Sequence, residues 1–102
     1  MSIFAGIWDV TIDTPIGKMA VVFDIVDVDG TISGTATSDA ETVDLVEAVA
    51  EGNRLTWKQA VTTPMRLTLK FDVTVEDDAM TGTSKAGMLP ASKVHGRRTT
   101  AR

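Results

Sequence analysis

The sequence predicts an all-β fold, an eight-stranded antiparallel up-and-down β-barrel made from a duplicated four-strand unit. Three observations favour it: apolar and polar residues alternate, turn motifs recur at short spacing, and the whole pattern repeats once along the chain. Alternation with a period of two is typical of a strand with one buried and one solvent-facing side. Short strands at regular spacing indicate a β-sandwich or a barrel.

The clearest strand is predicted over residues 65 to 76, where every second residue is apolar. A first strand and a fifth strand follow the same rule, and a second strand spans residues 18 to 28. Their predicted inward residues are Phe4, Gly6, Trp8, Val10 and Ile12, then Leu55, Trp57, Gln59 and Val61, then Val21, Phe23 and Ile25. Turn-forming residues separate the strands at Asp29-Gly30, residues 51–53 and Asp77-Asp78.

An internal repeat relates residues 3–50 to residues 54–101 within one domain that spans residues 1–102. Trp8 recurs as Trp57, a shift of 49 residues, and each is followed by a Thr-Pro pair. Phe23 recurs as Phe71 and Gly34 as Gly82, a shift of 48 residues. Two copies of a four-strand unit make eight strands, and closure into a barrel removes the exposed sheet edges.

The segment from Ser38 to Gly52 has two interpretations. Ser38 and Glu41 form a helix-capping pattern, and the apolar spacing and terminal Gly52 also suit a helix. The repeat instead predicts a strand, because the equivalent segment contains Pro90 and Gly96, which disfavour a helix. The strand is preferred here.

Charge and composition limit the classes of partner. The formal net charge is −4 and the pI is near 4.7, so the chain is repelled by nucleic acid and by anionic membranes. It has no cysteine and a single histidine, His95, so neither a metal site nor a cofactor is predicted. Since there is no signal-like or long apolar segment, a cytoplasmic location is expected.

Several motifs resemble those of the calycin superfamily, the lipocalin-like and streptavidin-like barrels. Gly6-Ile7-Trp8 is similar to the lipocalin Gly-x-Trp signature, and the resemblance implies that Arg98 packs over Trp8 at a closed end. The chain also resembles a set of short bacterial barrels in its spacing of Thr14 to Gly17, Asp29 to Gly34, Gly52 to Trp57, Thr63-Pro64 and Val94 to Arg98. The resemblance implies the fold rather than the function, because barrels of this family host binding and catalysis alike.

The candidate ligand-binding residues are expected to face the barrel interior. They are Trp8, Trp57, Phe23, Phe71, Gln59 and Arg98. The four aromatic rings either fill the interior or line a small apolar pocket. Gln59 stands between inward residues, so its amide needs a partner: a ligand, Arg98 or Thr14.

The leading functional hypothesis is therefore a small barrel that binds a compact apolar or aromatic molecule. The alternatives are a cofactor-independent cyclase, isomerase or lyase that uses the same pocket, and a structural module with a filled core. Glu47, Asp27 and His95 are the groups able to exchange protons, but none is placed by the pattern as a catalytic residue, so catalytic residues stay unknown.

Two predictions concern the outer surface. Closure of the last strand on the first places Lys93, His95 and Arg97 outside, beside Asp9 and Asp13. The outward residues of the second strand are apolar, namely Ala20, Val22, Val26 and Val28. Exposed apolar patches mark interaction surfaces, so we expect a homodimer or a higher homo-oligomer joined through this strand.

Overall fold

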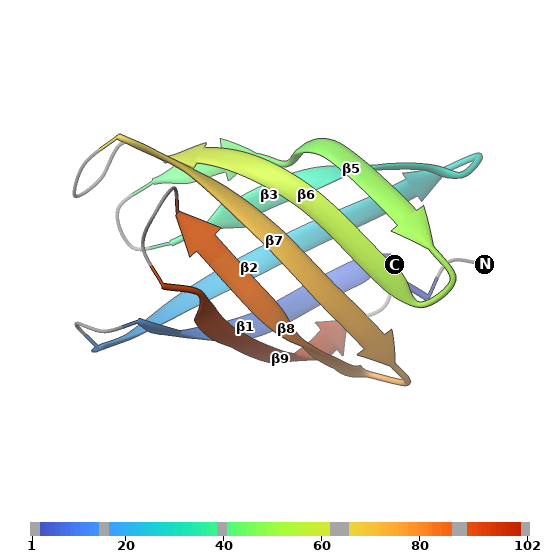
Figure 1. Ribbon diagram of the computed structural model, residues 1–102. Coiled ribbons are helices and arrows are strands. Elements are labelled where there is room, and N and C mark those ends of the chain that lie inside the picture. Colours follow the sequence, from blue (N-terminus) through green and yellow to red (C-terminus); the bar gives the residue numbers. More distant parts are fainter. Residues whose placement is uncertain (1–2, 15–16, 39–40, 62–65, 87–89, 101–102) are drawn as a thin grey trace.

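The computed structural model describes residues 3–14, 17–38, 41–61, 66–86 and 90–100. Within these ranges the chain forms nine strands and no helix, and all nine belong to one antiparallel sheet that wraps around itself (Figure 1). The strands are β1 (Gly6–Thr14), β2 (Gly17–Val28), β3 (Thr31–Thr37), β4 (Thr42–Asp44), β5 (Val46–Glu51), β6 (Arg54–Val61), β7 (Leu67–Glu76), β8 (Ala79–Ala86) and β9 (Ser92–Thr100).

The order of the strands makes the sheet a nearly closed barrel. Neighbours run β4-β3-β2-β1-β9-β8-β7-β6-β5, so the first strand pairs with the last. The two outermost strands, β4 and β5, are consecutive in the chain, and their junction lies at the seam. There the backbone N–H of Leu45 donates a hydrogen bond to the carbonyl of Gly34 on β3, at 3.0 Å.

The prediction of eight strands is wrong in number, because one predicted strand is divided. Its first part, β4, pairs with β3, and its second part, β5, pairs with β6, so the chain changes partner at the buried Leu45. Glu47 adopts a φ of 55° and the β5–β6 register shifts between Val46 and Val49, both signs of a bulge. The helical interpretation of Ser38 to Gly52 is also wrong for the residues described there; residues 39–40 lie outside the described residues.

The predicted repeat is visible in the pairing register. Trp8 lies opposite Phe23, and Trp57 lies opposite Phe71. The β2–β3 and β7–β8 turns begin with Asp29 and Asp77, whose φ values are 53° and 54°.

The two repeated glycines are both required by a close approach of backbones. A Cβ at Gly34 would overlap the carbonyl oxygen of Asp24, and a Cβ at Gly82 would overlap that of Asp72. The same tight contact between neighbouring strands therefore occurs once in each half.

Alternation along the strands places one side of each strand in a continuous core. The most deeply buried side chains are Trp8, Trp57, Phe23, Phe71, Ile25, Leu55, Met80, Val73, Val75 and Val94. Burial of this apolar surface is the main force that stabilises the sheet. Within the described part of the chain, no helix is long and apolar enough to cross a membrane.

The β1–β9 pairing confirms the predicted outer face of the last strand. Arg97 lies opposite Asp9, and Lys93 lies opposite Asp13. The His95 Nε2 atom is 3.5 Å from a carboxylate oxygen of Asp13. Val94 is buried while the three basic residues are exposed, as the alternation requires.

Candidate functional site

The barrel has two ends with different contents. We call the end with the β2–β3, β5–β6 and β7–β8 turns the Arg98 end. The other, where β1 ends and β2 begins, is the Gln59 end. The candidate residues from the sequence are spread along the interior between the two.

Three aromatic rings form a packed cluster in the interior. Trp57 and Phe71 are stacked, with centroids 5.0 Å apart and planes within 5°. Phe23 meets both rings edge-on, at 5.2 Å from Trp57 and 5.6 Å from Phe71. Such edge-on and stacked contacts add to the stabilisation that burial alone provides.

The rings leave no space beside them for a water molecule. Trp8 and Phe23 are 0% exposed, Phe71 is 1% exposed and Trp57 is 2% exposed. Since a ring that lines an open pocket is accessible to a water-sized sphere, the interior is filled at this level. That these residues bind a ligand stays a prediction, and such a ligand would have to displace one of the rings.

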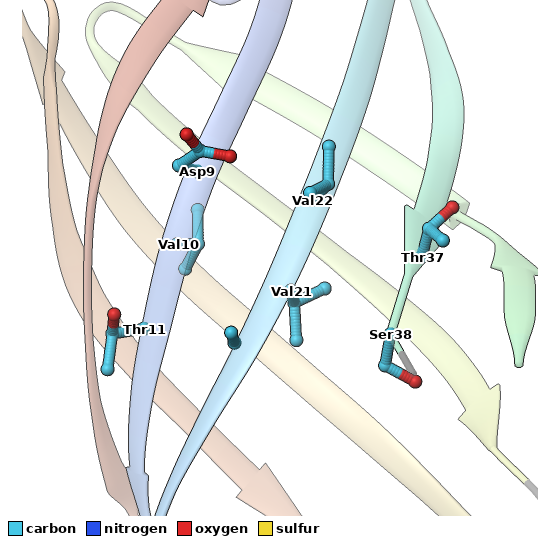
Figure 2. A pocket seen from close by; sticks show the side chains of 8 residues that line it. Asp9, Val10, Thr11, Val21, Val22, Thr37 and Ser38 are labelled. Atoms are coloured by element: carbon cyan, nitrogen blue, oxygen red, sulfur yellow. The ribbon is translucent and has the colours of Figure 1, made fainter. Parts of the chain in front are cut away.

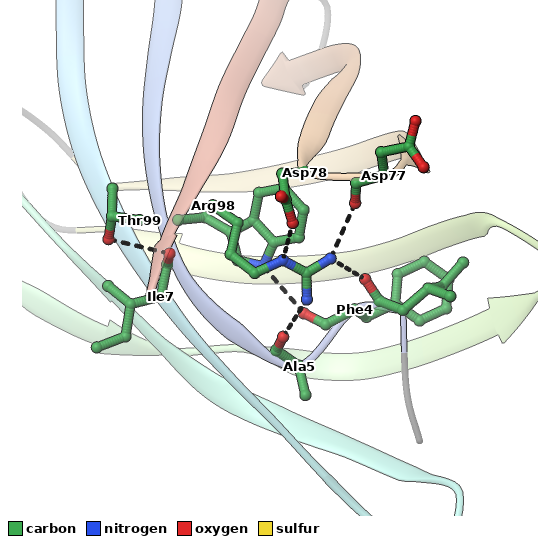
Figure 3. A network of polar contacts seen from close by, with 9 residues as sticks. Phe4, Ala5, Ile7, Asp77, Asp78, Arg98 and Thr99 are labelled. Atoms are coloured by element: carbon green, nitrogen blue, oxygen red, sulfur yellow. Dashed lines mark hydrogen bonds and ion pairs between the residues drawn. The ribbon is translucent and has the colours of Figure 1, made fainter. Parts of the chain in front are cut away.

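Arg98 packs over Trp8, as the resemblance implies, with its guanidinium carbon 4.5 Å from the ring centroid. Its donors also join three parts of the chain (Figure 3). They reach the carbonyls of Ile3, Ala5 and Asp77 and the carboxylate of Asp78, the last at 3.0 Å. Arg98 thus fastens the segment before β1 to the β7–β8 turn and closes this end of the barrel.

Gln59 has a different partner from those expected. It is 4% exposed, and its Oε1 accepts a hydrogen bond from the indole Nε1 of Trp57 at 3.0 Å. The expected bonds to Arg98 and Thr14 are wrong: Arg98 serves the opposite end, and the Thr14 hydroxyl donates to the carbonyl of Gly17 at 2.5 Å. The side chains of residues 57 and 59 share one face of β6, which explains the short local bond.

Inward apolar side chains are less buried towards the Gln59 end than at the rings. Met19 is 42% exposed, although Val21 and Phe23 on the same strand face are buried. Four more inward residues there are only partly buried: Val61, Leu67, Leu69 and Ala86. Two buried polar residues, Gln59 and Ser84, lie where these side chains meet the aromatic rings.

A hollow of about 300 Å³ lies outside the barrel, beside β1 and β2 where β3 ends (Figure 2). Ala20 and Val22 supply exposed apolar surface to it. The polar residues that line it are Asp9, Thr11, Thr37 and Ser38. Sequence reasoning missed this site, because the hollow depends on where β3 ends. The one local signal of a hollow is Ala20, which is smaller than the other outward residues of β2.

The groups able to exchange protons are spread over the surface. The Lys58 ammonium lies 2.8 Å from the Glu47 carboxylate and holds the pKa of Glu47 below its ordinary value, through a hydrogen bond and through its charge. The Asp27 carboxylate accepts a hydrogen bond from the Gly30 N–H at 2.9 Å and caps the β2–β3 turn. His95 faces Asp13 on the outer surface. These three groups do not converge on one site.

Among the described residues, no three side chains of His, Asp or Glu gather closely enough to hold a metal ion. No protein-family model, curated protein or solved structure matches the chain.

Proposed function

We propose that the protein binds a compact apolar molecule at the Gln59 end of its barrel. The observation that carries the proposal is the gradient of burial along the inward faces: Phe71 is sealed, whereas Leu69, Leu67 and Met19 are still partly exposed. A molecule seated there would cover apolar side chains that are partly exposed among the described residues, and burial of such surface is favourable.

The polar residues at this end supply the second argument. Gln59 and Ser84 are the two polar side chains buried in the described part of the chain, and both lie next to the partly exposed apolar residues. Ligand sites are mostly apolar with a few placed polar groups that orient the ligand. At the Arg98 end the described residues offer no such site, since Phe4 and the guanidinium are packed there.

A calycin-like assignment belongs to this proposal. It is supported by the stacking of Arg98 on Trp8 and by the nearly closed antiparallel barrel. In calycin-like barrels that bind ligands, one end is closed and the other admits the ligand. A cytoplasmic location stays a prediction.

Titration with N-phenyl-1-naphthylamine, an uncharged fluorescent probe, tests the proposal on the full chain. Leu69→Lys places a charge on the inward face, and Thr68→Lys places the same charge on the outward face one residue away. We expect saturable one-to-one binding to the native protein and about tenfold weaker binding to Leu69→Lys. Thr68→Lys should bind within about twofold of the native protein.

Circular dichroism of both variants confirms that they are folded before the titrations are compared. Absence of saturable binding to the native protein contradicts the proposal. Equal weakening by both variants contradicts it too, because the loss of binding would then not depend on the inward face of β7.

A further inference from the structure

Two rows of residues occupy equivalent places on the two halves of the barrel. Asp9, Val22 and Thr37 lie side by side across β1, β2 and β3. Shifts of 49 and 48 residues convert them into Lys58, Lys70 and Lys85, which lie side by side across β6, β7 and β8. We call the second row the lysine ridge; the first row lines the outer hollow.

The lysine ridge is costly for an isolated chain. Like charges directly opposite each other on neighbouring strands destabilise a sheet. Lys58 is compensated by Glu47 at 2.8 Å. Among the described residues, Lys70 and Lys85 have no carboxylate within 4.0 Å, and both are exposed. Beyond the larger effect of Lys58, the charge of Lys70 also helps to lower the pKa of Glu47. Lys85 is therefore the least compensated of the three.

The hollow has the opposite character. Its lining includes the acidic Asp9, the hydroxyl-bearing Thr11 and Thr37, and the apolar Ala20 and Val22. Arg97 lies opposite Asp9 on β9, but no ion pair within 4.0 Å joins Asp9 to another described residue. A lysine side chain has an apolar stem and a charged tip with three donors, so it matches both the apolar floor and the acidic rim.

The two halves of the sequence also carry net charges of opposite sign. Residues 1–51 contain ten acidic residues and one lysine, a net charge of −9. Residues 52–102 contain four acidic residues and nine lysines and arginines, a net charge of +5 with His95 neutral. Fields of opposite sign on two sides of a molecule steer one copy onto another.

From this complementarity we infer that the hollow receives the lysine ridge of a second copy of this chain. The expectation of an oligomer joined through β2 thereby gains a partner surface, β7 and β8. The contact joins different surfaces, so it is head-to-tail. Because β2 and β7 lie four strands apart around the barrel, each copy can bind one neighbour on either side, and association continues with rising concentration.

Sedimentation velocity at about 0.02 M and about 0.3 M salt tests this inference, since screening weakens contacts between exposed charges. The ridge variant carries Lys70→Glu and Lys85→Glu; the hollow variant carries Asp9→Lys and Val22→Lys. We expect the native chain to associate at low salt and each variant alone to associate about tenfold more weakly. Mixing the two should restore association, because the hollow of the first meets the ridge of the second.

The matched control is Arg66→Glu with Lys93→Glu, which changes the net charge as much as the ridge variant but lies outside the ridge. It should associate within about threefold of the native chain. Circular dichroism of every variant checks folding. A native chain that is monomeric at low salt overturns the inference. If each variant alone still forms dimers, the contact is symmetric and the inference is wrong. If the mixture of the two variants does not associate, the ridge of one copy does not bind the hollow of another, and the inference is also wrong.

Discussion

The two halves of the barrel agree on the inside and differ on the outside. Inward, Trp8 matches Trp57 and Phe23 matches Phe71, with the same cross-strand register. Outward, Val22 matches Lys70. Packing explains the difference, because inward side chains must fill a fixed volume, whereas outward ones have no such constraint. One backbone can therefore carry two opposite surfaces.

The largest expected effect comes from the matched tryptophans. Trp8→Ala and Trp57→Ala should each lower the free energy of unfolding by about 3–5 kcal/mol, because each removes a buried ring and leaves a cavity. Urea denaturation followed by circular dichroism measures the loss. If one substitution costs less than about 1 kcal/mol, that ring does not hold its half of the core and the comparison fails there.

The matched glycines should come next. Gly34→Ala and Gly82→Ala each force a methyl group into the carbonyl of the neighbouring strand, at Asp24 or at Asp72, so we expect a loss of about 3 kcal/mol in either half. Thr81→Ala, at an exposed position of β8, is the control and should cost about 0.5 kcal/mol. A tolerated substitution in just one half would mean that the two close approaches are not equivalent.

Arg98 is a position at which the inward residues of the two halves no longer correspond. Its counterpart by the shift of 48 residues is Ala50, so no guanidinium from that position covers Trp57. The indole N–H groups also differ in partner, since that of Trp8 donates to the carbonyl of Phe4 and that of Trp57 to the amide oxygen of Gln59. Arg98→Met keeps the aliphatic stem and removes the donors; it should cost about 2 kcal/mol in urea denaturation. Arg97→Met, next in the chain but on the outer face, should cost less than about 0.5 kcal/mol. Equal losses for the two variants would contradict the claim that Arg98 holds the segment before β1 against the β7–β8 turn.

The smallest expected effect depends on pH. Two hydrogen bonds from the Arg54 guanidinium, at 2.8 and 2.5 Å, hold the pKa of Asp72 below its ordinary value. A lowered carboxyl pKa stabilises the folded state above the ordinary value of about 3.9, and the contribution disappears as the pH falls through the lower, folded-state pKa.

Arg54→Gln removes this contribution, so the urea midpoints of native and variant protein should differ slightly at pH 6 and converge at an acid pH below the lowered pKa of Asp72. The matching position by the shift of 49 residues is Ala5, so no arginine takes the place of Arg54 in the first half. The same difference between native and variant protein at both pH values would show that the ion pair has no role in acid stability.

Most of the fold was predictable because inward alternation and turn residues are local signals. The strand over residues 18–28 and the inward faces of the first, second and fifth strands follow from them. The Arg98–Trp8 contact was expected from the resemblance to calycin-like barrels. The break at Leu45 was not predictable. It arises from closure of the barrel, because the segment pairs with β3 before Leu45 and with β6 after it. Glu47 has a positive φ, which its residue type does not predict.

The candidate sites were predictable only in part. The sequence placed the six candidate residues inside or at the end of the barrel, yet it could not give Gln59 its partner, which depends on the rotamers of two neighbouring side chains. The outer hollow depends on the length of β3 relative to β2, a tertiary property. The ridge facing away from it needed the register of β6, β7 and β8.

The central claim is that the lysine ridge and the row of Asp9, Val22 and Thr37 occupy equivalent positions in the two halves of the barrel. Thermal unfolding of one triple variant tests this claim most directly. Lys58→Asp, Lys70→Val and Lys85→Thr give the second half the residues of the first. We predict a folded barrel with a Tm within about 5 °C of the native value, since relief of the repulsion between three lysines offsets the lost Glu47–Lys58 pair and the new contact between Glu47 and an exposed aspartate. An unfolded chain, or a Tm lowered by more than about 10 °C, would contradict it.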